Sequence, residues 1–440
     1  MSKFFTDREL ETELLRQEEE EPLSDNESED DEDYVEESEH DTESDLGTSS
    51  DDEEVNDAST SNNFYFSKDK NTKWNKKPIK VSGRTRQHNI ITHLPGVKGI
   101  AKNAKTPHDT FKLYFDEELM NILVLNTNIY ILKIRVNYKR VADAQDTDII
   151  ELTAFIGLLL MSGVYRAAHL NIEELWDEDG PSIFSLTMSY KLFLFLYLCI
   201  RFDNINSRDE RKKTVKLAAV REIIDLFEKK FELAYTPAEY TTIDEQLIPF
   251  RGRCPFRQYL PNKPKRYGIK VFTLVDSRTF YLLKFEIYAG AQHDGPYKKV
   301  NTPFDIVQRL VEQIKGSGRN LTTDNWYSSG VDTCDQLCSN YNVGRRTRRW
   351  PLAIFNYFIN VSAVNAYIVF KSNTKETIKR RIFLKNLAKS LTLDHILRRG
   401  NNNHILRSLR QKIWIYLGTQ GINKEQVTNE VDNTRDSKKT

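Results

Sequence analysis

Residues 267–288 have the sequence YGIKVFTLVDSRTFYLLKFEIY, and this stretch decides the fold class. Tyr267–Val275 and Thr279–Tyr288 are rich in β-branched and aromatic residues, which is typical of strands, and Asp276–Arg278 between them has the composition of a turn. The stretch therefore predicts a β-hairpin. A further strand is predicted around Ile243, so three consecutive strands are expected.

A helix with recognisable ends follows the hairpin. Thr302 is expected as its N-cap with Pro303 at the first helical position, Asp305 completes a start that resembles a capping box, and Gly316 follows the end. Its apolar face is expected to consist of Ile306, Val307, Leu310, Val311 and Ile314. Residues 319–323 (RNLTT) then predict a short strand that ends just before Asp324.

The order strand, strand, strand, helix, strand is that of the start of an RNase H-like fold, so we expect an α+β protein with a mixed sheet. Asp244 would lie on the first strand and Asp324 just beyond the fourth, within an RNase H-like core at residues 241–339. The sequence predicts no fifth strand before Asp332. The strand that ends at Asp324 would then be an exposed edge, which carries a risk of aggregation.

Mainly helical regions are expected on both sides of this core. Residues 107–240 contain four apolar segments long enough for helices, at 115–131, 151–165, 183–203 and 220–235, and residues 340–417 are also expected to be helical. Pro351–Phe370 is long and apolar but contains Asn356, Asn360 and Asn365, so it predicts a buried helix rather than a membrane span. Neither a signal segment nor a membrane partner is expected.

The net charge of zero conceals two oppositely charged parts. Residues 1–60 contain 26 acids and 3 bases, so the rest of the chain keeps 38 of the 64 acids and 61 of the 64 bases. Residues 1–62 are expected to form a disordered acidic tail and 418–440 a disordered polar tail, because they cannot bury enough apolar surface. Residues 63–106 predict a basic linker, with a nuclear import signal as the alternative. A body this basic indicates a nucleic-acid partner, against the alternative of a lysine-rich surface.

Four cysteines in 440 residues argue against a secreted disulfide scaffold. Cys334 and Cys338 form a CxxxC pair without a nearby histidine or second cysteine pair. Two thiols in the core or on a helix face are therefore favoured over a zinc site.

Four aspartates are candidates for a metal site. Asp244 and Asp324 are expected on strands that neighbour each other in this fold, and Asp332 and Asp335 are spaced to share one helical face. Three carboxylates on one sheet can hold a pair of divalent metal ions for phosphodiester chemistry. The alternatives are turn or cap residues for the first two and a solvated acidic face for the others.

Three motifs carry a resemblance to a known family. TIDEQLIPFRGRCPFRQYLPNKPKRYGIK at 242–270, DNWYSS at 324–329 and GVDTCDQLCSNYNVGRRTRRWPLAIFNYFINVSAVNAY at 330–367 resemble the piggyBac group of DDE transposases and the host genes derived from them. The resemblance extends from about Phe111 to Ile413 and is weakest in the N-terminal helices.

The resemblance implies roles for the four aspartates. Asp244, Asp324 and Asp332 match the three catalytic aspartates, and Asp335 matches an acid that supports metal binding. The family relation further implies two Mg²⁺ ions as cofactors, cutting and joining of DNA at TTAA-flanked ends, a homodimer and a location in the nucleus. It also implies that the helical region at 107–240 is a dimerisation and DNA-binding domain and that the helical region at 340–417 is a C-terminal DNA-binding region. Phosphoryl transfer of this kind needs metal-held oxygens and charge neutralisation more than a covalent nucleophile.

Two basic clusters are candidate DNA-binding segments. Arginine side chains can contact phosphates, and the aromatic rings between them can stack on unpaired bases. The candidates are Arg251, Arg253, Arg257, Lys263, Lys265 and Arg266 in the first cluster and Arg345, Arg346, Arg348, Arg349 and Trp350 in the second. The alternative is that some of these arginines pair with the acidic tail or cover apolar surface.

The chain departs from the family pattern in two places. A segment that separates the second aspartate from the third in the family is missing between Ser329 and Gly330. No cysteine follows Ile413, so the C-terminal cysteine-rich zinc domain of many members is not expected. Asp332 would therefore lack its usual support, and about 1 Å of misplacement can cost on the order of 100-fold in rate. We expect a transposase-derived DNA-binding protein with weak or lost catalysis. The alternatives are an active transposase on a shortened scaffold, an incomplete gene sequence of one, and a non-enzymatic chromatin-associated protein.

Overall fold

The computed structural model describes residues 64–66, 73–75, 90–91, 93–261, 266–291, 294–295, 297–323 and 329–421. The acidic tail expected at 1–62 and residues 422–440 of the polar tail lie outside the described residues. The described residues from Ile91 onward belong to one compact unit. A second unit contains β1 (Phe64–Phe66) and β2 (Lys73–Asn75), which pair antiparallel.

The main unit consists of strands, α-helices and short 3-10 helices. Its strands are β3 (Gly96–Val97), β4 (Tyr235–Thr236), β5 (Tyr240–Pro249), β6 (Arg257–Tyr259), β7 (Tyr267–Asp276), β8 (Leu282–Ile287) and β9 (Asn320–Thr323). Its α-helices are α2 (Pro107–Lys112), α3 (Glu117–Ile134), α4 (Ile149–Val164), α5 (Ile183–Thr187), α6 (Tyr190–Cys199), α7 (Arg208–Lys212), α8 (Arg221–Ala234), α9 (Pro303–Val311), α10 (Ser329–Asn340), α11 (Trp350–Thr374), α12 (Arg380–Gly400) and α13 (Arg407–Thr419). Its 3-10 helices are η2 (Gly99–Asn103), η3 (Arg135–Asn137), η4 (Val141–Ala144), η5 (Ala167–His169), η6 (Ile172–Trp176), η7 (Ile205–Ser207) and η8 (Glu312–Ile314).

The central sheet has the predicted strand order. β7 pairs antiparallel with β5 on one edge and with β8 and β6 on the other, and β9 runs parallel to β5. The order β8, β7, β5, β9 places the third, second, first and fourth expected strands side by side, as in an RNase H-like sheet. No strand among the described residues pairs with the outer edge of β9.

Asp276 fixes the turn of the β7–β8 hairpin. Its Oδ1 accepts hydrogen bonds from the backbone N–H groups of Arg278 (2.9 Å) and Thr279 (2.8 Å) and from the Thr279 hydroxyl (3.1 Å), and its Oδ2 accepts one from the N–H of Ala238. The Asp276 side chain is fully buried. β8 begins at Leu282 rather than at Thr279 as expected, because Phe280 has a left-handed φ of 64° that interrupts an extended strand.

The helix after the hairpin, α9, has the predicted ends. The Thr302 hydroxyl accepts a hydrogen bond from the N–H of Asp305 (3.3 Å), Pro303 occupies the first position, and Gly316 beyond η8 has a φ of 71°. Ile306, Leu310 and Ile314 are buried, and α9 packs against β7 and β8. The apolar face predicted from the sequence therefore contains the residues that are buried where α9 packs on the sheet.

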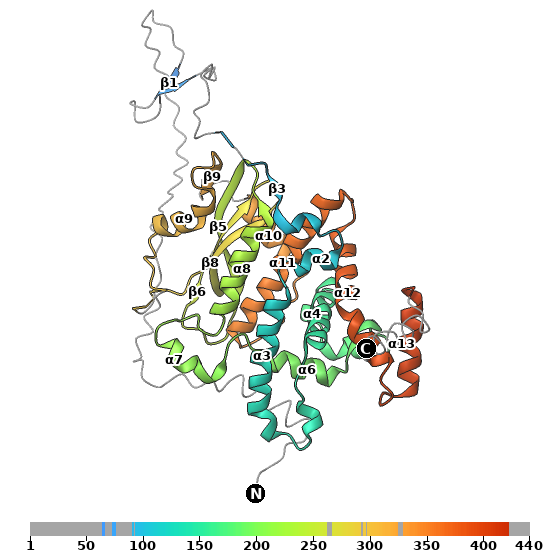
Figure 1. Cartoon of the computed structure of the whole chain (residues 1–440). Coiled ribbons are helices and arrows are strands. Elements are labelled where there is room, and N and C mark those ends of the chain that lie inside the picture. The colour runs from blue at the N-terminus through green and yellow to red at the C-terminus, as the bar shows by residue number, and fades with distance from the viewer. Residues whose placement is uncertain are drawn as a thin grey trace, which may run out of the picture. The chain divides into compact units, whose positions relative to one another are not determined.

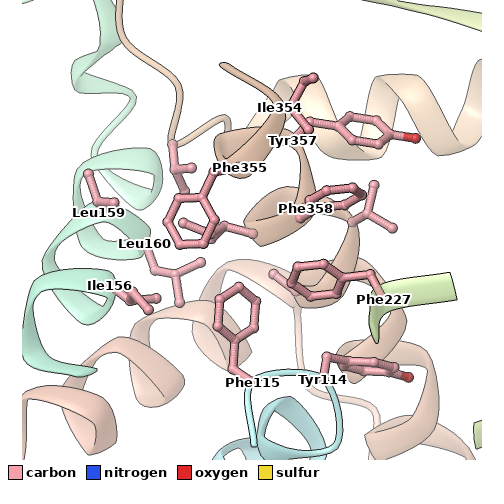
Figure 2. Packing of buried hydrophobic residues seen from close by; sticks show 14 of the residues in the cluster. Tyr114, Phe115, Ile156, Leu159, Leu160, Phe227, Ile354, Phe355, Tyr357 and Phe358 are labelled. Carbon is pink, nitrogen blue, oxygen red and sulfur yellow. The ribbon is translucent and has the colours of Figure 1, made fainter. Parts of the chain in front are cut away.

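Helix α11 lies at the centre of the hydrophobic core. In Figure 1 it runs between the sheet on the left and the helices α4 and α12 on the right. Figure 2 shows the aromatic rings that it contributes: Phe358 stacks on Phe227 of α8 with a centroid distance of 4.5 Å, and Phe355 lies 6.0 Å from Phe115. Phe358 also lies 5.0 Å from Phe285 of β8, so one helix joins the sheet to the helical layer.

Asn360 and Asn365 of α11 bond to backbone inside the core, and the Asn360 Oδ1 accepts a hydrogen bond from the N–H of Val343 (3.0 Å). Asn365 accepts a hydrogen bond from the N–H of Leu282 and donates one to its carbonyl, both at 3.0 Å, as a neighbouring strand would. By length and composition alone, α11 and the segment Glu117–Asn137 could each cross a bilayer. Because 94% of the apolar window of α11 is buried inside the protein, its apolar character is that of a core helix, as predicted.

The segment expected as one helix at 183–203 is broken into α5 and α6. Met188 is extended, with φ −153° and ψ 165°, and the Ser189 hydroxyl accepts a hydrogen bond from the N–H of Leu192 (3.2 Å) as the N-cap of α6. Because the apolar pattern continues across the break, it does not reveal that the helix ends there. The sequence signal for the new start is Ser189, a residue type that is favoured as an N-cap.

Acid is expected to destabilise the fold through His395 of α12. Burial, together with Arg398 and Arg399, lowers the pKa of His395 to about 4. The unfolded chain therefore takes up a proton at this site below about pH 6.5, whereas the folded chain does not. The free energy of unfolding should thus decrease by up to about 3 kcal/mol as the pH falls from about 6.5 to about 4.

Chemical unfolding of the wild type and His395→Gln at a series of pH values measures this effect. We expect the variant to lose that part of the pH dependence. His404→Gln, at an exposed histidine, is the matched control and should retain it. Equal slopes for the wild type and His395→Gln would contradict the assignment.

Candidate functional site

Asp244 lies on the face of the sheet that packs against α11, opposite to the face that α9 covers. Side chains alternate between the two faces of a strand, so Asp244 shares its face with Gln246, whose Oε1 accepts a hydrogen bond from Tyr357 of α11 (2.7 Å). Glu245 points to the opposite face, where it pairs with Lys270 (2.7 Å). Asp244 is half-buried, and its Oδ1 accepts a hydrogen bond from the N–H of Glu245 (2.7 Å).

The register of β5 and β9 brings two of the predicted segments together. The parallel ladder ends with Ile243 opposite Thr323. Asp244 is the next residue on β5, and Asp324 is the next residue in the chain after β9. Asp324 itself lies outside the described residues, so its predicted role stays a prediction.

Helix α10 holds Asp332 and Asp335 on its exposed side. Its buried side consists of Val331, Cys334 and Cys338, and the helix packs against β5 and β7. Asp332 lies in its first turn, and both aspartates are exposed side chains that make other contacts within the protein. The shortened connection was expected to leave this helix without support, but its own apolar side docks it on the strand that carries Asp244.

Gln246 and Tyr357 form a buried link that the sequence interpretation did not identify. Gln246 is 3% exposed, and Tyr357 lies close to Cys334 and Cys338 of α10. Burial raises the pKa of the Tyr357 hydroxyl well above its usual value, so it stays protonated and donates to Gln246. This hydrogen bond joins β5 to α11 beside α10, and its sequence signal was a polar residue within the predicted strand.

The described residues alone do not form a metal site. No three of their His, Cys, Asp or Glu side chains gather closely enough to bind an ion. Asp244 and Asp332 nevertheless supply carboxylate oxygens, the ligand type that Mg²⁺ prefers, on a strand and a helix that pack together. These donors are compatible with Mg²⁺, and any site would have to include a further ligand.

The basic clusters divide into exposed and bonded arginines. Those of the first cluster that the structure describes are exposed, as are two of the second: Arg251, Arg253, Arg257, Arg266, Arg346 and Arg348. The Arg257 guanidinium donates to the carbonyls of Arg251 (3.3 Å) and Gly252 (3.0 Å), which fixes the loop before β6. Lys263 and Lys265 lie outside the described residues.

Two arginines of the second cluster bond to backbone carbonyls instead. Arg345 donates to Ala167 (2.6 Å) and Leu170, and burial lowers its pKa. Arg349 donates to Tyr197 (3.1 Å), Leu198 (3.0 Å) and Ile200, at the C-terminal end of α6. The residues are within the predicted cluster, but in this structure their guanidinium groups stabilise loop and helix ends.

The two clusters lie side by side, although about ninety residues separate them in the sequence. Phe256 and Trp350 pack edge to face at 5.1 Å, and a Cβ added to Gly252 would lie 2.8 Å from the carbonyl oxygen of Arg348. The loop before β6 therefore touches the segment before α11. We call Arg251, Arg253, Arg257, Arg346 and Arg348 the basic surface.

Comparison with known proteins identifies the relatives of this chain. A family model described as Transposase IS4 matches residues 106–330 and 325–367, which is more than half of the chain. The two matched segments meet at 325–330, where the connection between Asp324 and Asp332 is short.

Two similar human proteins are PiggyBac transposable element-derived proteins 2 and 3 (Homo sapiens). The first is 23% identical over 227 residues, which are 51% of this chain and 36% of that protein. The second is 22% identical over 240 residues, which are 53% of this chain and 38% of that protein. The chain therefore covers little more than a third of the length of these relatives.

A solved structure of a piggyBac transposase synaptic complex with hairpin DNA has a similar fold. The match has a TM-score of 0.67 and 27% sequence identity, and it covers 73% of this chain and 87% of that one. The strand order, the placement of Asp244 and α10, the family model and this structure agree. The chain belongs to the piggyBac-type transposase family.

Proposed function

We propose that the chain is a DNA-binding member of this family that recognises DNA through the basic surface. The observation that carries the proposal is the junction at Phe256 and Trp350, which gathers exposed arginines from two distant segments onto one surface. An arginine guanidinium group can form two parallel hydrogen bonds to one phosphate, and Trp350 adds an aromatic ring nearby. The DNA in the related synaptic complex supports the same partner class.

We propose further that its ancestral chemistry was metal-dependent cutting and joining of DNA at TTAA sites, and that this activity is weak or lost. Asp244, Asp324 and Asp332 would hold two Mg²⁺ ions with the help of Asp335, and bound metal would activate the attacking oxygen and neutralise phosphate charge. Docking of α10 on β5 keeps Asp332 near the strand of Asp244. The short connection after Asp324 is the reason to expect reduced activity, and a location in the nucleus belongs to the same proposal.

A nicking assay on TTAA-flanked DNA ends with Mg²⁺ tests the catalytic part. We expect binding with at most a trace of nicking, and any nicking should be lost in Asp244→Ala. The matched control is Glu245→Ala, which removes the adjacent carboxylate on the opposite face of β5. This variant should retain whatever nicking the wild type shows.

The assay separates the proposals by outcome. Robust nicking that depends on Asp244 would favour the active transposase on a shortened scaffold and overturn the loss of catalysis. Absence of both nicking and salt-sensitive DNA binding would overturn the proposed function and favour a chromatin-associated protein that does not contact DNA.

A further inference from the structure

Helix α10 carries two cysteines on the side that packs against the sheet. Cys334 and Cys338 are 0% and 7% exposed, and their side chains hydrogen-bond to each other. They are spaced at i and i+4, so they lie one above the other on the same face of the helix. Together with Val331 they form the buried side through which α10 contacts β5 and β7. The contact that holds Asp332 near the strand of Asp244 therefore includes two thiol groups.

The C-terminal end of α10 is attached to other helices by polar contacts. The Arg380 guanidinium of α12 donates a hydrogen bond to the carbonyl of Leu337 (2.6 Å) and lies 4.8 Å from the centroid of the Tyr341 ring. Just beyond the helix, the Asn360 Oδ1 of α11 accepts a hydrogen bond from the N–H of Val343 (3.0 Å). A distortion in the middle of α10 is therefore expected to move its N-terminal half rather than the anchored end.

A disulfide between these two cysteines does not fit a regular α-helix. Side chains at i and i+4 have Cβ atoms about 5–6 Å apart, whereas a disulfide needs Cβ atoms about 3.5–4.5 Å apart. The Cα atoms, about 6 Å apart along the helix axis, are within the range that a disulfide spans. The bond can therefore form only when the turn between Cys334 and Cys338 departs from helical geometry, and once formed it prevents that turn from becoming helical again.

We infer that Cys334 and Cys338 form a redox switch: the reduced pair docks α10 on the sheet, and oxidation of the pair to an intrahelical disulfide releases the half of the helix that carries Asp332 and Asp335. The oxidant is a small disulfide such as oxidised glutathione. Cys338, the more exposed of the two, attacks one sulfur of the oxidant, which gives a mixed disulfide and expels one thiol. Cys334 then attacks the sulfur of Cys338 and expels the second thiol. Two protein thiols are thereby oxidised, the small disulfide is reduced, and the two protons pass to the two thiols released.

Burial of the two sulfur atoms makes oxidation depend on the opening of α10. In the docked helix an oxidant does not reach them, so the exchange starts from molecules in which the helix has opened locally. Oxidation and docking are then linked, so a change that weakens docking must favour oxidation by the same factor. The inference does not rest on DNA binding or on nicking, because the thiol state and the docking of α10 are both measured on the protein alone.

A glutathione titration of the full chain tests the cysteine pair. Reduced and oxidised glutathione are mixed at graded ratios, free thiols are trapped by alkylation, and the tryptic peptide 320–345, which contains Cys334 and Cys338 and no other cysteine, is analysed by mass spectrometry. We expect this peptide to lose two hydrogens and both alkylation sites as the oxidised fraction rises, and to regain them with dithiothreitol. Two free thiols at equilibrium with excess oxidised glutathione, or glutathione attached to Cys338 without an intrahelical bond, would overturn the switch.

Hydrogen exchange measured by mass spectrometry tests the release of α10. The backbone amides of residues 331–337 should exchange on the order of 100-fold faster after oxidation, because the opened helix is then the dominant state. Cys334→Val keeps an apolar side chain of similar volume and cannot form the bond, so its exchange should be the same in reducing and oxidising buffer. Cys199→Ala, at a buried cysteine outside α10, is the matched control and should respond as the wild type does. Unchanged exchange in a chain shown to contain the disulfide would disprove the release.

Val331→Ala tests the link between docking and oxidation. The variant removes two methyl groups from the buried side of α10 and leaves both cysteines in place. The equilibrium constant for oxidation by glutathione should rise on the order of 10-fold, because only the reduced, docked state loses packing. Val300→Ala is the matched control, since Val300 is 63% exposed and lies outside α10, and it should leave the constant unchanged. An unaltered constant in Val331→Ala would show that oxidation does not require undocking and would overturn the switch.

Discussion

Replacement of Arg251, Arg253 and Arg346 together by alanine is expected to weaken DNA binding on the order of 100-fold at moderate salt, since each lost phosphate contact costs about 1 kcal/mol at an exposed site. The physical reason is counterion release: each arginine that neutralises a phosphate contributes about 0.9 to the slope of the binding constant against salt on logarithmic axes. The slope should therefore decrease by about 2.7 in the triple variant. Fluorescence anisotropy with labelled duplex DNA over a range of salt concentrations measures both quantities.

The matched control keeps the charge at the same three positions. Replacement by lysine should preserve most of the salt slope and lose less affinity, because lysine retains the point charge but not the planar guanidinium. Arg349→Ala should behave differently from all of these, with a lower unfolding temperature, because its guanidinium bonds three carbonyls near the end of α6. An alanine triple variant with unchanged affinity and slope would exclude the basic surface as the DNA contact.

Replacement of Asp276 by alanine is expected to lower the free energy of unfolding by about 4 kcal/mol. The buried carboxylate accepts hydrogen bonds from three backbone N–H groups, those of Ala238, Arg278 and Thr279, and from the Thr279 hydroxyl. Alanine would leave the buried N–H of Ala238 and the partly buried donors of Arg278 and Thr279 without this partner, at about 1–3 kcal/mol for each donor that cannot find another. Urea unfolding followed by circular dichroism measures the loss.

Two further variants test whether the loss of stability is caused by removal of the buried Asp276 carboxylate. Asp294→Ala removes a carboxylate that is 91% exposed, so its effect should stay within about 0.5 kcal/mol. Asp276→Asn keeps one acceptor oxygen and should be intermediate, because its amide nitrogen cannot accept the hydrogen bonds made to the second oxygen. If Asp276→Ala unfolded at the same urea concentration as Asp294→Ala, the turn would not depend on this carboxylate.

Much of the sheet and the helix that follows it could be predicted from local sequence. The β-rich runs on either side of Asp276 and the capping residues Thr302 and Pro303 act within a few residues of the chain, so their patterns are visible without tertiary information. The break before Ser189 was missed because the apolar pattern continues through it. The late start of β8 was missed because a left-handed φ at Phe280 has no signal in a phenylalanine.

The sequence indicated the residues of the candidate site, but it did not indicate the packing that holds them in position. Motif resemblance located Asp244 and Asp332, whereas the docking of α10 through Val331, Cys334 and Cys338 depends on how the helix meets the sheet. The arginine clusters show the same division. Sequence identified Arg345 and Arg349 as part of a basic run, but carbonyls far away in the sequence determine where their guanidinium groups bond.

The sequence by itself determined the family, the strand order and the aspartates that carry the family pattern, because these follow from local periodicity and from motifs read along the chain. Only the tertiary structure decided which arginines are exposed together and how α10 is held near Asp244. These properties depend on which surfaces become buried when distant segments pack together, and local propensity carries no information about that.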